Sequence, residues 1–200
     1  SPFYTVLALW VGGLILVAII HTKVEIEPAF KNAKPYQQFF GRYITFFLIA
    51  QIQALITVLG DLYFIEIECA HPFLFWLAAS CCSFVFGFLM YALTAAFGNI
   101  GEGLAIIIMV IQVAGAGCTF PIETLPKVFQ TFYQFQPFKY AMGAMKEAVA
   151  GMYQDDYWKD LAILLSYTII SLIVGLVLAV PFRKLNHILE ESKEKSGVML

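Results

Sequence analysis

Long apolar runs alternate with shorter polar stretches along the chain. The runs are roughly 17 to 25 residues long, the length that an α-helix needs to cross a bilayer. They cover residues 3–20, 43–59, 73–97, 103–119 and 161–182. Hydrophobic residues make up 60% of the 200 residues and charged residues only 13%, well outside the composition of a soluble globular domain. The pattern therefore predicts an all-α membrane protein with five transmembrane helices.

The stretch between the first two runs is polar at its start and aromatic at its end. It reads HTKVEIEPAFKNAKPYQQFFGRY (residues 21–43), and after Pro35 the aromatic residues recur at helical spacing: Tyr36, Phe39, Phe40 and Tyr43. This spacing predicts a short amphipathic helix that lies at the membrane interface and leads into the second span. Two interpretations stay open. The helix anchors the loop to the lipid surface, or it is a contact surface for a cytoplasmic partner.

Residues 117–151 are too apolar and aromatic for a solvated loop, yet Pro121, Pro126 and Pro137 interrupt any continuous span. Proline suits the first turn of a helix, where its missing N–H group is not needed. We expect one helix after Pro126 and a second after Pro137 that ends at Gly151. Each is only about 10 to 15 residues long, too short to cross the bilayer. The pattern predicts two helices that dip into the membrane and return.

Each of these short helices carries an apolar stripe at helical spacing. The stripes consist of Val128, Phe129, Phe132 and Tyr133 in the first helix, and of Phe138, Ala141, Met142, Met145 and Val149 in the second. Helix ends at membrane depth are tolerated only where protein buries them or where they line a water-filled cavity. A hairpin of this kind is expected to form a lid.

The distribution of lysine and arginine indicates the orientation of the spans. Residues 21–42 and 183–195 together hold eight basic residues, and residues 120–160 hold four. The excess of basic residues on the cytoplasmic side of membrane proteins then places the N-terminus and the hairpin outside and the C-terminus in the cytoplasm. Because the chain starts outside at Ser1, which is not an initiator methionine, we expect at least one earlier span upstream. Residues 1–200 are then a single transmembrane domain from the C-terminal part of a longer chain.

Motifs for catalysis and nucleotide binding are absent from the sequence. There is no G-x-x-x-x-G-K-[ST], no H-E-x-x-H and no G-x-S-x-G. The glycine-rich GNIGEG (residues 98–103) joins two predicted spans, so we interpret it as a tight turn rather than a phosphate site. The sequence therefore predicts no catalytic residue, no cofactor and no nucleic-acid partner.

Metal ligation has little support. The cysteines, Cys69, Cys81, Cys82 and Cys118, show neither C-x-x-C spacing nor a histidine at ligand spacing. Asp156 and Asp160 share one helix face, which suits either a solvated carboxylate pair or a cation site. We predict no metal site, and whether Cys69 and Cys118 pair as a disulfide stays open.

Few polar side chains lie inside the predicted spans. The amides are Gln51 and Gln53 in the second span and Gln112 in the fourth, and the last span holds Ser166 and Thr168. Burying an amide costs free energy unless it finds a hydrogen-bonding partner, so these groups are expected to face the bundle interior. They suit either contacts between helices or, for Gln51 and Gln112, a contact with substrate.

Three stretches in order resemble the C-terminal membrane region of the YhgE/Pip family, in the type-2 ABC permease superfamily. They are VLGDLYFIEIECAHPFLF (58–75), FGNIGEGLAIIIMVIQVAGAGCTFPIETLP (97–126) and QPFKYAMGAMKEAVAG (136–151), together with LALWVGGLIL near the start and the GRY before the second span. The resemblance covers nearly the whole chain. It implies a six-helix permease whose first helix and large extracellular domain precede this segment.

The resemblance also implies roles for two sets of residues. The cytoplasmic stretch corresponds to a coupling helix that touches a nucleotide-binding subunit, with Lys31, Lys34, Tyr36, Gln37, Phe40 and Arg42 as contacts. The outer stretch corresponds to a re-entrant gate formed by Pro121, Glu123, Pro126, Pro137, Phe138, Lys139, Tyr140, Lys146 and Glu147. The sequence departs from the family pattern at Cys118 and Lys139. A charged Lys139 either reaches the lipid headgroups or meets an anionic cargo.

Two functions follow as hypotheses. The first is the permease of an ABC-type exporter in a bacterial plasma membrane, which moves an amphipathic or lipid-like substrate outward. It works as a homodimer or permease dimer with a separate cytoplasmic ABC ATPase. The second is a membrane-anchored surface receptor or scaffold without transport activity. It meets phage or secretion partners through an extracellular domain upstream.

Overall fold

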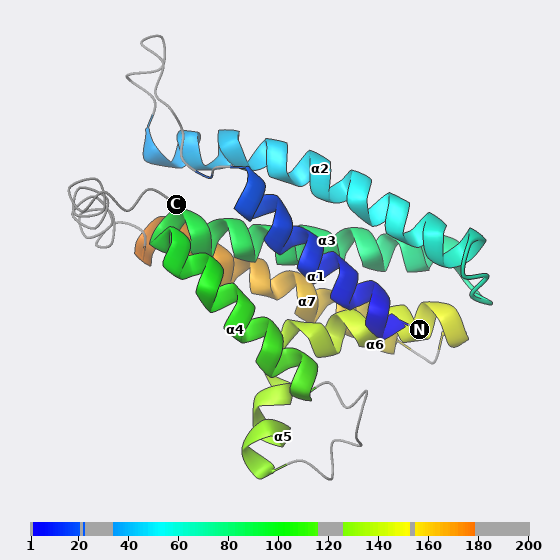
Figure 1. The fold of residues 1–200 in the computed structure, drawn as a ribbon. Helices are drawn as coiled ribbons and strands as arrows, with labels where there is room; N and C mark the ends of the chain where they lie inside the picture. The colour runs from blue at the N-terminus through cyan, green and yellow to red at the C-terminus, as the bar shows by residue number, and fades with distance from the viewer. Residues whose placement is uncertain (1, 21, 23–33, 116–125, 153–154, 179–200) are drawn as a thin grey trace.

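The computed structural model describes residues 2–20, 22, 34–115, 126–152 and 155–178. Regular structure in these residues is helical throughout: α1 (Pro2–Ile19), α2 (Pro35–Tyr63), α3 (Pro72–Phe97), α4 (Asn99–Gly115), α5 (Lys127–Gln134), α6 (Pro137–Ala150), α7 (Asp156–Leu172) and η3 (Ile173–Leu178), a π-helical continuation of α7. Figure 1 shows the long helices gathered into one bundle, with α5 at its lower edge. The predicted all-α class is confirmed.

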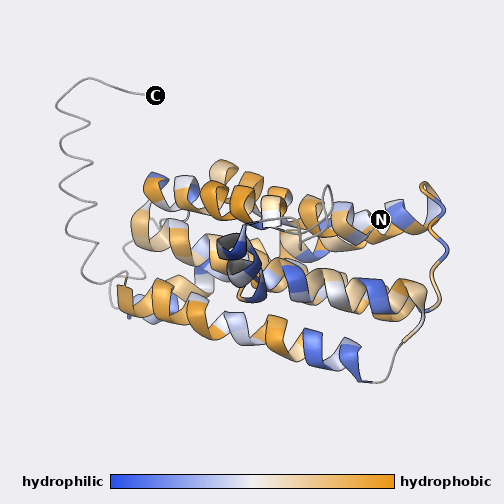
Figure 2. Ribbon diagram, turned by 90° about the horizontal axis from the view of Figure 1, so that it is seen from below, coloured by the Kyte–Doolittle hydropathy of each residue, from blue (hydrophilic) through white to orange (hydrophobic). Residues whose placement is uncertain are grey.

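Four helices of the described chain are long and apolar enough to cross a membrane: α1, α2, α3 and the continuous α7–η3. The fourth predicted span, residues 103–119, corresponds to α4, an apolar helix of 17 residues. Its last predicted residues, 116–119, lie outside the described residues. Figure 2 shows apolar residues along most of the length of the long helices, as lipid contact requires.

The central helix is α3, which packs against α1, α2, α4, α6 and α7. Every residue from Val85 to Thr94 is buried. Small side chains allow the close contacts, since hydrophobic driving force between helices is weak inside a bilayer. A methyl group placed on Gly13 of α1 would lie 3.8 Å from Cα of Gly87, and Ser83 donates a hydrogen bond of 2.8 Å to the carbonyl of Ala50 on α2.

The predicted turn of the GNIGEG segment is confirmed at Gly98, but Asn99 and the residues after it already belong to α4. α3 ends at Gly98, whose φ of 59° lies in the left-handed region that favours glycine, and α4 begins at the next residue. The backbones of the two helices meet at Gly101. A methyl group there would overlap the carbonyl oxygen of Leu93 and lie 2.9 Å from the amide nitrogen of Thr94. The chain therefore needs glycine at position 101 to turn so sharply.

We expect Gly101→Ala to destabilise the fold by about 1–3 kcal/mol, because the added methyl meets rigid backbone. The matched control is Gly103→Ala in the same motif, since a methyl group on Gly103 meets nothing within 4 Å. Thermal unfolding of both purified variants in lipid nanodiscs measures the difference. Equal transition temperatures for the two variants would show that α3 and α4 are not in contact at this turn.

The predicted amphipathic stretch after Pro35 is part of a longer element. It forms the first two turns of α2, which runs without a break through the second span to Tyr63. Gly41 does not interrupt the helix, and nothing lies within 4 Å of a methyl group placed on it. Phe39 and Tyr43 are buried against the bundle, while Tyr36 and Phe40 are exposed. The predicted helix is present, but it is continuous with the second span, and only two of its four aromatic residues face the bundle.

The loop between α2 and α3 closes the end of α6. The N–H groups of Ala70 and His71 donate to the carbonyls of Val149 and Ala148 at 3.1 and 3.0 Å, and the Cys69 thiol donates to the carbonyl of Ala148 at 3.4 Å. The last carbonyls of a helix have no partner within the helix, so this loop supplies them. The contacts place this loop and the end of α6 at one end of the bundle, as the charge-based orientation requires.

Candidate functional site

The two short helices predicted between Pro126 and Gly151 are present. α5 begins directly after Pro126, and α6 begins at Pro137 and stops at Gly151, whose φ of 100° ends the helix. The predicted stripe of α6 faces the core, because Phe138, Ala141, Met142 and Met145 are buried and Val149 packs at its edge. Of the stripe on α5 only the Tyr133 side chain lies among the described ones, and it packs against the core.

The junction between α5 and α6 lies at the depth of the middle of α7. Tyr167 donates a hydrogen bond of 2.6 Å to the carbonyl of Phe135, and it is close to the midpoint of the 23-residue span Asp156–Leu178. Tyr140 donates a second bond of 2.7 Å to the carbonyl of Gln134. These hydroxyls satisfy backbone carbonyls that lipid cannot pair. The base of the hairpin therefore lies at mid-length of α7, at the side of the bundle, and the Tyr167 bond holds it to α7.

α6 and α7 pack closely at a glycine of α6. The carboxylate of Asp160 on α7 lies directly over Gly143 on α6, and a methyl group on Gly143 would overlap Oδ2 and lie 3.0 Å from Cγ. Asp156 forms an ion pair of 3.1 Å with Lys159 on the exposed face of α7. The two aspartates predicted as one pair thus have different surroundings. Within the described residues no group of three or more possible metal ligands occurs.

Lys139 lies among aromatic rings at the base of the hairpin. Its Nζ is 5.7 Å from the centroid of Tyr133 and 5.3 Å from that of Tyr140, within the range of cation–π attraction.

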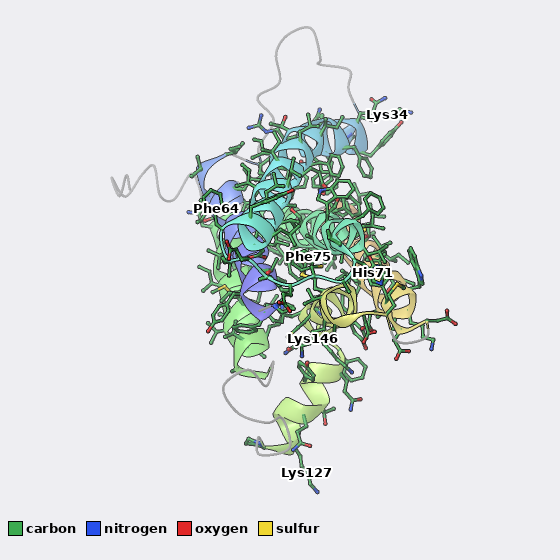
Figure 3. All side chains as sticks on the ribbon, turned by 90° about the vertical axis from the view of Figure 1, so that its right-hand side faces the viewer. Lys34, Phe64, His71, Phe75, Lys127 and Lys146 are labelled. Carbon is green, nitrogen blue, oxygen red and sulfur yellow. The ribbon has the colours of Figure 1, made fainter. Side chains whose placement is uncertain are left out.

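The other predicted gate residues are dispersed. Phe138 is buried, Lys146 is exposed at the far end of α6, and Pro121 and Glu123 lie outside the described residues. Glu147 lies on α6 near its end. Figure 3 shows Lys127 pointing away from the bundle at the tip of α5.

The amides of the predicted spans differ in their surroundings. Gln51 donates to the carbonyl of Ser80 at 3.2 Å and accepts from the Ser80 hydroxyl, and Gln53 donates to the carbonyl of Ala8 at 3.2 Å. These bonds join α2 to α3 and to α1. Gln112 on α4 is only 1% exposed, yet neither atom of its amide has a hydrogen-bonding partner among the described residues. Gln51 and Gln53 therefore act between helices, and Gln112 does not.

The start of α2 meets η3, the π-helical end of the α7 span. The ring of Phe39 lies against Gly175 of η3, where a methyl group would come within 2.5 Å of Cζ. Tyr91 of α3 donates a hydrogen bond of 2.8 Å to the carbonyl of Phe39, and its ring lies 4.9 Å from that of Phe39. π-Helical turns are rare and recur at functional sites. Phe39 thus joins α2, α3 and η3.

The predicted coupling residues lie at the start of α2, around Phe39. Tyr36 is 48% and Phe40 41% exposed, and Lys34 is exposed at the start of the helix. Gln37 accepts a hydrogen bond of 2.9 Å from the backbone N–H of Lys34 and so helps to begin α2. The guanidinium of Arg42 lies 6.0 Å from the ring of Phe46. Lys31 lies outside the described residues.

Sequence reasoning missed several residues that the fold brings together. Thr5 of α1 donates a hydrogen bond of 2.5 Å to the buried carboxylate of Asp61 on α2. Gly143 and Gln136 were also not singled out. An acidic residue inside an apolar helix was the available signal for Asp61. Gly143 matters only because of the side chain opposite it, which a sequence does not show.

Comparison with known proteins gives one family and one curated relative. A family model described as "ABC-2 family transporter protein" matches residues 1–179. The chain is 24% identical over 176 residues to the "Uncharacterized protein YhgE" of Bacillus subtilis (strain 168), an alignment that covers 88% of this chain. The chain spans 22% of the length of that relative, about a fifth. No solved structure matches.

Proposed function

Because the chain belongs to the ABC-2 transporter family, it is a multi-pass membrane component of transport, and we propose that it is the permease of an exporter for amphipathic or lipid-like substrates. A separate ATPase supplies the energy, since the sequence holds no P-loop. The observation that carries the proposal is the hydrogen bond from Tyr167 to the carbonyl of Phe135. It holds the α5–α6 hairpin at the middle of the α7 span, where a movable hairpin closes or opens a path.

The cytoplasmic face of α2 suits an ATPase contact. Tyr36 and Phe40 point away from the bundle, while Phe39, between them, is buried against α3 and η3. Aromatic side chains that are half exposed are typical of contact surfaces. In this proposal the ATPase binds Lys34, Tyr36 and Phe40 and moves the start of α2, and Phe39 passes that displacement to Gly175.

α7 with η3 connects the two ends of the permease. At the cytoplasmic end Gly175 contacts the ring of Phe39. At mid-length Tyr167 donates a hydrogen bond to the base of the hairpin. Closer to the outer end Asp160 packs against Gly143 of α6. Energetic coupling between distant sites requires an element with two discrete arrangements. In this proposal the π-helical segment η3 is such an element, and a return to α-helical pairing shifts its residues relative to α7. A displacement at Phe39 thereby moves α7 relative to the hairpin.

The proposed orientation predicts labelling by a membrane-impermeant maleimide. We expect Phe64→Cys, at a side chain 90% exposed in the α2–α3 loop, to react in intact cells, and Lys34→Cys to react only after lysis. Native Cys69 gives a slow background, because burial raises the pKa of its thiol despite a hydrogen bond from the His71 backbone. The thiolate is the reactive form, so this background rises with pH towards that pKa. Labelling of Lys34→Cys in intact cells would show that the start of α2 lies outside, and the proposed orientation would be wrong.

The ATPase contact is tested with a photo-crosslinking amino acid in the full-length protein. Placed at Tyr36, it is expected to capture a P-loop ATPase. Placed at Tyr63, 74% exposed at the opposite end of α2, it is the matched control and captures none. Lys34→Glu with Tyr36→Ala should remove the captured ATPase and stop outward movement of a fluorescent phospholipid. Capture at neither position, with lipid movement unchanged in the double variant, would favour a receptor or scaffold without transport.

The remaining features belong to the same proposal. The domain works as one unit within a longer chain, two copies pair, and the membrane is the bacterial plasma membrane. Pairing of copies is common among membrane transporters and oligomers with closed symmetry. Since the chain spans 22% of its curated relative, the partners of the whole protein, including phage or secretion partners, depend on regions beyond these residues.

A further inference from the structure

Two buried glutamines lie on the elements that meet at the base of the hairpin. Gln112 is on the last turns of α4 and is 1% exposed, and Gln136 immediately precedes α6 and is 8% exposed. Among the described residues, both amide atoms of Gln112 and the Oε1 atom of Gln136 have no hydrogen-bonding partner. Buried polar groups of native proteins are almost always paired, so three open atoms at this base require an explanation.

Gly115 brings the two elements together. A methyl group on Gly115 would lie 3.6 Å from Oε1 of Gln136 and 3.9 Å from Cβ of Tyr133. Gln112 is three residues before Gly115, so the two positions are neighbours on one helix face, about 5–6 Å apart. Gln112 and the position that contacts Gln136 therefore lie on one face of α4. The open atoms of both glutamines belong to this contact between α4 and the start of α6.

The chemistry of the open atoms limits the group that fits. Gln112 offers one donor nitrogen and one acceptor oxygen whichever way its amide is turned, and Gln136 adds a second acceptor oxygen. A hydroxyl or amide group on the ligand donates to an oxygen and accepts from Nε2. A phosphate or carboxylate has only acceptors and would face two amide oxygens. Lys139, the nearest described cation in sequence, lies instead over the rings of Tyr133 and Tyr140.

We propose that Gln112 and Gln136 form a subsite for an uncharged, hydroxyl- or amide-bearing head group of the exported amphiphile. The inference rests on the proposed function and names its substrate class. Both side chains are buried in the described arrangement, so the head group reaches them when the contact between α4 and the hairpin opens. The subsite then selects among amphiphiles by head group, while the apolar chain lies along the lipid-facing helices.

The test compares two probes with the same tails: dioctanoylglycerol, with a hydroxyl head, and dioctanoyl phosphatidic acid, with an anionic head. Each is added to the full-length protein in nanodiscs, and the thermal unfolding temperature is measured. Dioctanoylglycerol should raise it by several degrees more than the phosphatidic acid. Gln112→Met should abolish that difference. It should also raise the unfolding temperature of the unliganded protein by about 2–4 °C, because an unpaired buried amide is removed.

Gln51→Met is the matched control, since Gln51 is already paired with Ser80. It is expected to lower the unliganded transition and to keep the preference for dioctanoylglycerol. Gln136→Met is a second variant with the same expected loss as Gln112→Met. Equal shifts of the unfolding temperature with both probes, or a preference that survives in both glutamine variants, would show that the glutamines do not bind a head group. Ordered water would then be the partner of their amides.

The outcome is distinguishable from failure of the proposed function. If the preference is found but no ATPase-driven lipid movement occurs in any form of the protein, the permease proposal fails and the head-group subsite stands as a lipid-binding site. If lipid movement is found and Gln112→Met moves hydroxyl-headed and anionic lipids in the native ratio, the subsite is wrong and the permease proposal stands.

Discussion

Gly175→Ala is expected to uncouple ATP hydrolysis from outward lipid movement while the protein still folds and reaches the membrane. The added methyl group would lie 2.5 Å from Cζ and 2.7 Å from Cε2 of Phe39, and 3.3 Å from Cβ of Ala92. Phe39 cannot simply withdraw, because its ring is enclosed by Phe40, Phe88 and Tyr91 at centroid distances of 4.9 to 5.9 Å. The start of α2 must therefore shift away from η3.

The size of this effect follows from the overlap. Overpacking of this kind costs about 1–3 kcal/mol. If the strain falls mainly on one of the two transport states, the rate of lipid movement falls by ~5- to 150-fold. The measurement is lipid movement per ATP hydrolysed in proteoliposomes that contain the full-length protein and its ATPase. Gly41→Ala is the matched control, because a methyl group on Gly41 of α2 meets nothing within 4 Å. Full coupling in Gly175→Ala would exclude transmission through Phe39.

Sequence patterns predicted most of the helices because each signal is local. Apolar run length gave the spans, and prolines followed by apolar stripes gave α5 and α6, with Pro137 and Gly151 at the observed ends of α6. The glycine-rich GNIGEG signal gave the turn at Gly98. These features depend on residues close together in the chain, so periodicity and turn chemistry suffice to find them.

The candidate site was less accessible to sequence reasoning. The amphipathic stretch after Pro35 and the second span looked like two elements, because the period of polar residues changes there while the backbone continues as one helix. Gln51 and Gln112 looked alike, but only the fold shows that Ser80 pairs with the first. Gly143 and Gly175 acquire their importance from Asp160 and Phe39, which are distant in sequence. Long-range packing decides such roles.

The central claim is that the hairpin must move relative to α7 for transport to occur, and a reversible disulfide between α6 and α7 tests it. Cγ of Asp160 lies 3.0 Å from the position that Cβ would take on residue 143, so the two Cβ atoms are at most about 4.5 Å apart, within disulfide range. The variant is Gly143→Cys with Asp160→Cys, with the native cysteines replaced by alanine. Each single variant is a control for the loss of the carboxylate or of the glycine.

The measurement is outward movement of a fluorescent phospholipid in proteoliposomes with ATP, before and after reduction of this disulfide. The account predicts that movement stops when the disulfide forms and resumes when a reductant opens it, while the single variants do not respond to the reductant. Movement at the same rate in the fully oxidised and the reduced double variant would contradict the account, because α6 would then be fixed to α7 throughout transport.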